Sequence, residues 1–245
     1  MTHLRDEIDA NHAVFFKDWT AALAKNVKDL ESNPVFVERY RRITVLQAIK
    51  AHIVVPNYTA ESAAFYSEAH NDALVSHVAA SAGAWRTALQ SLRSCIENVL
   101  CAVYYSEHPV ELELWGAGEF LIGYSDLMKY LEKHPRLAGL NENVKGLGLI
   151  KSEYATLSKA VHASAADFRM TDAAANVLLW SSDKRKASQW STRERKTIRG
   201  ICLLLTAKHS PLLQGTKLTP LRDVLGFAVS SADKKGLKAL GVNVP

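Results

Sequence analysis

Residues 84–109, AWRTALQSLRSCIENVLCAVYYSEHP, contain the clearest helical pattern in the chain. Large apolar residues recur there at alternating spacings of four and three positions, which matches one face of an α-helix. These residues are Trp85, Leu89, Leu92, Ile96, Val99 and Val103. Pro109 ends the pattern, because proline cannot continue a helix and disfavours helical geometry in the residue before it. The stretch therefore predicts one long helix with a buried apolar face.

Helical periodicity also dominates the rest of the chain, so we expect an all-α protein, a single-domain helical bundle of about seven or eight helices. The expected helices cover residues 5–30, 34–56, 60–81, 84–107, 125–135, 149–164, 192–213 and 220–231. Within this domain we distinguish an N-terminal helical pair (1–56), a central core (60–215) and a basic C-terminal helix with its tail (216–245).

Local signals place some of these helix ends. Asn33 and Pro34 have the residue types preferred at an N-cap and at the first helical position. Ser191 and Glu194 form the pattern of a capping box, which predicts that a helix starts at residue 192. Glycines interrupt residues 109–123, where we expect a loop, with a short strand as the alternative.

The composition argues against several classes of site and location. No apolar run reaches the length of a membrane span, and the polar, acidic N-terminal sequence does not resemble a signal peptide. The three cysteines are odd in number and lack zinc-ligand spacing, which indicates a reduced compartment. No glycine-rich phosphate loop is present. We therefore expect a cytoplasmic protein with no membrane contact, no metal and no cofactor.

One group of metal-ligand residue types lies in the predicted 60–81 helix. His70 and His77 are two helical turns apart, whereas two histidines of one helix hold a metal at one-turn spacing. A partner-facing polar surface or a buried hydrogen-bond network is the favoured interpretation. A metal site shared with a second helix is the alternative.

The charge is unevenly distributed along the chain. Residues 1–180 contain 17 Lys and Arg against 21 Asp and Glu, whereas residues 181–245 contain 13 against 4. The segment 184–199, KRKASQWSTRERKTIR, combines cations that can neutralise phosphates with a tryptophan that can stack on an exposed base. The candidate nucleic-acid-binding residues are Lys184, Arg185, Lys186, Trp190, Arg193, Arg195, Lys196 and Arg199. The alternative is a solvated basic surface in which Trp180 and Trp190 hold a loop on the core.

Two predicted helices place polar side chains on one face. In the first, Arg86, Gln90, Arg93 and Glu97 stack at spacings of four, three and four. In the second, Tyr154, Ser158 and His162 are four residues apart, and Arg169 follows. Together such groups could bind an anion or transfer protons. A solvated helix face, or a buried polar cluster that ties two helices together, is the alternative.

The pattern Tyr154…Leu157-Ser158…Val161-His162…Ser164, after a helix with Arg93…Glu97-Asn98, resembles a branch of the HEPN superfamily over about residues 60–215. Members are small all-α bundles, many of them bacterial and dimeric, associated with RNA cleavage, toxin–antitoxin systems and defence against phages. The resemblance implies an HEPN-like core and a site at a dimer seam.

The resemblance also implies catalytic roles for individual residues. Arg93 and Arg169 would stabilise phosphate charge, and His162 would act as general acid and base, oriented by Glu97 or Tyr154. The chain departs from the pattern of active HEPN ribonucleases, because no histidine follows Arg93 on the same helix. That departure puts metal-independent cleavage in question.

Two functional hypotheses follow. In the first, the chain is an HEPN-like defence or toxin protein that binds nucleic acid, RNA in preference to DNA, cleaves RNA without a metal, and pairs as a homodimer or with a partner protein of a defence system. In the second, it is a non-catalytic helical adaptor or partner-binding subunit of a multi-protein defence complex. Convergence of Arg93, Glu97, Tyr154 and His162 would favour the first hypothesis.

Overall fold

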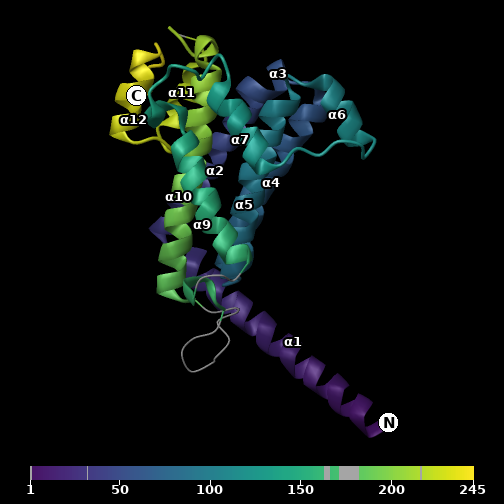
Figure 1. Ribbon diagram of the computed structural model, residues 1–245. Helices are drawn as coiled ribbons and strands as arrows, with labels where there is room; N and C mark the ends of the chain where they lie inside the picture. Colours follow the sequence, from purple (N-terminus) through teal and green to yellow (C-terminus); the bar gives the residue numbers. More distant parts are fainter. Residues whose placement is uncertain (1, 32, 163–165, 171–181, 216) are drawn as a thin grey trace.

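The computed structural model describes residues 2–31, 33–162, 166–170, 182–215 and 217–245, and every regular element among them is helical (Figure 1). This confirms the predicted all-α class. The described residues form eleven α-helices when the continuous run α2–η1–α3 is counted once, which is more than the expected number. None of these helices is both long and apolar enough to cross a membrane.

The N-terminal pair begins with α1 (Thr2–Glu31), which projects from the rest of the molecule (Figure 1). The next helix, α2 (Pro34–Ile49), starts where the sequence predicted, because the Asn33 side chain accepts a hydrogen bond from the backbone N–H of Val35 at 3.0 Å. It continues through a π-helical turn, η1 (Lys50–Val54), into α3 (Val55–Asn57).

The centre of the molecule is the helical hairpin of α4 (Ala60–Ser81) and α5 (Trp85–Tyr105). Gly83 joins them in the left-handed conformation, at φ 77°, which a residue with a side chain rarely adopts. All six members of the α5 apolar stripe are buried. The stretch that decides the fold in sequence therefore forms the core of the bundle.

Short helices account for the difference between the expected and the observed number of helices. The region expected to be a loop begins with α6 (Pro109–Gly116), in which Pro109 occupies the first turn. It leads through α7 (Tyr124–Lys133) to α8 (Glu142–Lys145) and α9 (Leu147–Val161). The expectation of a loop across all of 109–123 was wrong, because two glycines end the helix at its C-terminus without breaking its start.

The longest basic helix, α10 (Lys184–Lys208), begins eight residues before the predicted start at residue 192. Its N-cap is Asp183, whose side chain accepts a hydrogen bond from the backbone N–H of Lys186 at 2.7 Å. The predicted capping box was therefore wrong: Ser191 and Glu194 lie inside the helix. Glu194, one of the two residues of that pattern, instead makes a buried contact with α2.

The C-terminal residues complete the bundle. After η2 (Ala166–Phe168) and α10, the chain forms η3 (Ser210–Leu212), α11 (Thr219–Leu225) and α12 (Ser231–Ala239). Ser230 and Asp233 make a reciprocal capping box, so α12 begins with a well-defined cap. A single buried apolar cluster contains residues from Leu30 to Val244.

A buried ion pair joins α2 to α10. Glu194 is 2% exposed, and its carboxylate accepts hydrogen bonds from Arg42 Nε at 3.1 Å and Nη2 at 2.7 Å. A second guanidinium, that of Arg39, lies 3.9 Å from the same carboxylate and 5.1 Å from the Trp190 ring. The two arginines and one glutamate fix the rotation of α10 against α2.

We predict that Glu194→Ala destabilises the protein by about 3–5 kcal/mol, because it leaves two arginines buried without their counter-ion. The free energy of unfolding from urea denaturation measures the change. Asp126→Ala is the matched control, since the Asp126–Lys129 pair is exposed and worth less than about 1 kcal/mol. Equal losses in the two variants would contradict the prediction.

Candidate functional site

Arg93 lies at the centre of a hydrogen-bond network between α5 and α9. Its guanidinium donates to the Tyr154 hydroxyl at 2.6 Å, to Glu97 Oε2 at 3.3 Å and to Ser158 Oγ at 3.3 Å. The Tyr154 hydroxyl in turn donates to Glu97 Oε1 at 2.7 Å. The four polar side chains therefore satisfy one another and hold the two helices together.

An aromatic stack extends this network to α7. The rings of Tyr124 and Tyr154 lie parallel, with centroids 3.4 Å apart, and the Arg93 guanidinium lies 4.8 Å from the Tyr154 ring centre. Burial, followed by the hydrogen bond to Glu97, raises the pKa of Tyr154 to about 12. The hydroxyl therefore stays protonated at neutral pH and acts as a donor rather than as a base.

The other two predicted catalytic residues lie outside this network. His162 caps the C-terminal end of α9 and its side chain is exposed. No contact between described residues joins it to Arg93, Glu97 or Tyr154. Arg169 is also exposed and lies beyond α9, where its backbone N–H donates to Ala166. The structure thus brings together three of the five predicted residues and leaves the proposed acid and base apart from them.

The predicted basic segment forms the outer face of α10. Residues 184–199 contain seven cations and a single acid, Glu194, and that acid is buried. Lys184, Arg185 and Arg195 are exposed, whereas the other cations are half-buried. Among the described residues of this half of α10, no carboxylate of the helix itself is therefore exposed.

Acids of neighbouring helices pair with three of the cations. Glu153 of α9, which is fully buried, binds Arg193 Nη1 at 3.0 Å and Lys196 Nζ at 3.6 Å. Asp233 of α12 accepts two hydrogen bonds from Arg199, both at 2.7 Å. Arg199 therefore ties α10 to α12, and we no longer place it in the nucleic-acid-binding surface.

Trp190 does not provide a stacking surface for a base, so this prediction was wrong. Its side chain is 1% exposed, its indole N–H donates to Ser76 Oγ at 2.9 Å, and its ring stacks on Phe36 at 5.2 Å. Trp190 packs on the core, as the alternative expected, but it does so from within α10 and not from a loop. Trp180, the other half of that alternative, lies outside the described residues.

A polar groove of about 330 Å³ lies beside the basic face of α10. Its lining comes from α9, from the segment after it and from α10: Thr156, Phe168, Ser188, Gln189, Thr192 and Arg193. Phe168 supplies the aromatic ring of this groove, whereas the sequence had predicted that Trp190 would stack on a base. Nothing in the sequence marked Phe168, because it stands next to a stretch without periodicity.

Backbone contacts hold residues 166–170 in this position. Arg86 of α5 donates to the Phe168 carbonyl oxygen at 3.2 Å, and Lys186 of α10 donates to the Arg169 carbonyl oxygen at 3.0 Å. The segment therefore bridges the beginnings of two helices. The side chain of Arg169, the residue after Phe168, is exposed.

A second polar cluster lies at the opposite end of the bundle, around Glu107. This carboxylate pairs with Lys208 Nζ at 2.8 Å, accepts from His134 Nε2 at 2.9 Å and from the Tyr130 hydroxyl. The other ring nitrogen of His134 accepts from the backbone N–H of Arg136, so the Nε2 nitrogen of the neutral ring must carry the proton. Sequence reasoning missed this cluster, because its members come from three distant segments.

The environment of this cluster lowers the pKa values of Glu107 and His209. Burial raises the pKa of Glu107, but the hydrogen bonds from Lys208, Tyr130 and His134 outweigh it and lower the pKa to about 2. Burial, and then the charge of Lys208, lowers the pKa of His209 to about 3. His209 Nε2 lies 3.0 Å from the Tyr58 hydroxyl. A pocket of about 260 Å³ adjoins these groups.

The Glu107 cluster has a clear structural role. Four helical elements end beside it: the run α2–η1–α3, and the helices α5, α7 and α10. The C-terminal end of a helix carries a partial negative charge, so it favours a positively charged side chain. Lys208 supplies that charge from within the last turn of α10, while Glu107 compensates its burial. The cluster joins helix ends and needs no ligand to explain it.

Metal and thiol chemistry find little support. Among the described residues, no group of His, Cys, Asp and Glu could hold a metal ion. Asp72, which lies two residues after His70 on α4, accepts a hydrogen bond from Asn98 at 2.8 Å. Burial raises the pKa of Cys101 to about 11 and raises those of Cys95 and Cys202 further, so none of the three is an activated nucleophile.

We predict that acid unfolding depends on Glu107. Its folded pKa lies below the unfolded value of about 4.3, so its stabilising effect is present above that value and is lost as the pH falls towards 2. Glu107→Gln should flatten the rise in stability between these pH values, by about 1 kcal/mol after screening at this partly exposed site. Urea denaturation at pH 2.5 and pH 6 measures the difference. An unchanged pH dependence would contradict the assignment.

Comparisons with known proteins add no further constraint. No family model, curated protein or solved structure matches this chain. The HEPN resemblance therefore stays a prediction, and a function must be argued from the geometry of the described residues.

Proposed function

We propose that the chain binds single-stranded nucleic acid along the outer face of α10 and in the adjoining groove. The observation that carries this proposal is the row of cations in residues 184–199 of α10, where the single acid of the segment, Glu194, is buried. Lys184 and Arg185 stand one helical turn before the groove residue Ser188, and Lys196 stands one turn after Thr192. The cations therefore lie on both sides of the groove opening.

Electrostatics favours a polyanion at this surface. The cations attract phosphates, and binding releases counter-ions from the nucleic acid, so affinity should fall steeply with salt. The N-terminal end of α10 adds the positive pole of its helix dipole in the same place. Glu153 neutralises only part of the charge, because it is shared between Arg193 and Lys196.

The groove favours an unpaired base over a duplex. Phe168 offers a ring for stacking, while Gln189 and the hydroxyl groups of Ser188 and Thr192 can form hydrogen bonds with base edges. These features do not discriminate between RNA and DNA. The preference for RNA in our proposal rests on the HEPN resemblance.

We assign a binding role to the chain and no cleavage. The donors of Arg93 already bind Glu97, Tyr154 and Ser158, so little of its charge is available to a phosphate. His162 and Arg169 are separate from that network. These observations support the second hypothesis, that of a non-catalytic helical subunit, here one that holds nucleic acid for a partner protein in a defence complex.

We predict that Lys184→Glu combined with Arg185→Glu weakens binding of a fluorescent single-stranded RNA at least tenfold at 0.15 M salt. The salt dependence of log K should become shallower by about 1.4, if two phosphate contacts are lost. Fluorescence anisotropy at several salt concentrations measures both. Lys186 is left unchanged, because its contact with Arg169 supports the groove wall.

Two further variants sharpen this test. Lys129→Glu with Lys133→Glu on α7 changes the net charge equally at an exposed site outside the proposed surface. Phe168→Ala should reduce affinity by about 1–3 kcal/mol per stacked base without changing the salt slope. Equal weakening by the α7 control and the α10 variant would refute a localised binding surface.

The ribonuclease hypothesis predicts that the purified protein cleaves RNA, whereas our proposal predicts that it only binds RNA. We expect no cleavage of total RNA in the presence of EDTA, because the predicted acid–base residue His162 does not meet Arg93 in the structure. Gel analysis of the RNA over several hours measures this. EDTA-resistant cleavage that disappears in His162→Ala would establish an HEPN-type ribonuclease instead.

A further inference from the structure

The outer half of α1 exposes large apolar side chains. Leu4, Ile8 and Phe15 are 56–60% exposed, and Phe16 is 50% exposed. Figure 1 shows this part of the helix extending away from the bundle. A helix of this length gains little stability in water unless its apolar face is packed. These side chains therefore indicate a contact that the single chain does not provide.

The exposed face continues the face by which α1 packs on its own bundle. Towards the C-terminal end, Asn26 is 3% and Leu30 is 8% exposed, and the Asn26 side chain donates to the Ala82 carbonyl oxygen at 3.3 Å. Leu4, Ile8 and Phe15 fall on the same helical face as Asn26, by the spacing of three and four residues. One stripe is therefore buried at the base and uncovered at the tip.

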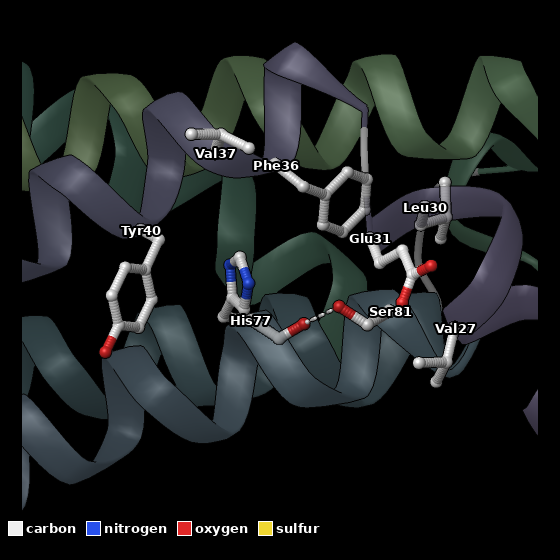
Figure 2. Close-up of a pocket in the computed structure, with 8 residues that line it drawn as sticks. All are labelled: Val27, Leu30, Glu31, Phe36, Val37, Tyr40, His77 and Ser81. Atoms are coloured by element: carbon white, nitrogen blue, oxygen red, sulfur yellow. Dashed lines mark hydrogen bonds between the residues drawn. The ribbon is translucent and has the colours of Figure 1, made fainter.

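An apolar groove opens at the base of the same helix. It measures about 270 Å³ and is lined by α1, α2 and α4. Figure 2 shows Val27, Phe36, Tyr40 and His77 among the side chains around it. Tyr40 is 56% exposed, and His77 Nδ1 is buried without a hydrogen-bond partner among the described residues. The groove is thus an incompletely filled site next to an uncovered helix.

We propose that the occupant of this groove is the α1 tip of a second copy of the chain, so that two copies pair through antiparallel α1 helices. Eleven residues separate Leu4 from Phe15, and eleven separate Phe16 from Val27. With Phe15 and Phe16 at the twofold axis, each span is about 16 Å. The Leu4 of one copy then lies level with Val27 at the groove of the other.

The charge pattern of α1 suits the antiparallel direction. Residues 3–11 contain Arg5 and three acids, a net charge of −2, whereas residues 20–28 contain two lysines and no acid, a net charge of +2. In the antiparallel pair, residues 3–11 of each copy lie beside residues 20–28 of the other copy, so this favourable contact occurs twice. A parallel pair would instead place like charges together.

The expected interface is of modest size. Half of each α1, seated on the base of the other helix, buries about 1,000 Å² in total, which is at the lower limit for a specific complex. The contact is isologous, since the same tip and groove occur in both copies, and it therefore closes as a dimer. It uses neither the basic face of α10 nor its groove, so it can be tested separately from nucleic-acid binding.

Sedimentation velocity over a range of concentrations tests the dimer. We expect a reversible dimer, and at least a tenfold weaker one in Ile8→Glu, because that change places a charge in the apolar contact. Leu121→Glu is the matched control, since Leu121 is 86% exposed on a distant loop. A protein that stays monomeric up to about 100 μM overturns the proposal, as does a dimer that Ile8→Glu does not weaken.

A cross-link tests the geometry. Leu4→Cys combined with Val27→Cys places two thiols on one straight helix, about 35 Å apart, so they can form a disulfide only between two copies. The three natural cysteines are buried or half-buried. We expect mild oxidation to give a covalent dimer from the double variant. Each single variant should give a lower yield of that dimer. A dimer in solution that does not cross-link overturns the antiparallel arrangement.

Discussion

The contact between Glu194 and the two arginines of α2 determines how the rest of the molecule is arranged. Removing these charges from water is costly, so the carboxylate and its partners must meet in one geometry. That geometry sets the rotation of α10. Trp190, one turn earlier on the same face, is then directed into the core, and the cations of residues 184–199 are directed outwards. The burial of Glu194 against α2 therefore determines that the cations of α10 face outwards.

The helix α9 separates two kinds of polar chemistry. On one edge, Tyr154 and Ser158 bind Arg93 and close a network in which each group has a partner. On the other edge, Thr156 and the buried Glu153 face α10 and contribute to an open groove and to a partly neutralised basic surface. The first arrangement stabilises helix packing. The second leaves a groove open beside the cations of α10.

The sequence predicted what depends on local periodicity. The α5 stripe follows from helical spacing, and the start of α2 at Asn33 follows from the residue types preferred at a helix start. Features that depend on which helices pack together were not predictable. Glu194 has the residue type of a cap, yet it belongs to a pair whose other members lie about 150 positions earlier. Phe168 and Glu107 gain their roles only from tertiary neighbours.

Among the long helices that the structure describes within the bundle, α2–η1–α3, α5 and α10 run in the same direction, and α4 and α9 run against them. Their peptide dipoles therefore do not cancel, and the molecule has an electrical polarity along its length. The positive pole coincides with the cationic surface, and the negative pole coincides with the Glu107 end. The nucleic acid that we propose as the ligand would therefore be oriented by this field towards the cationic end during its approach.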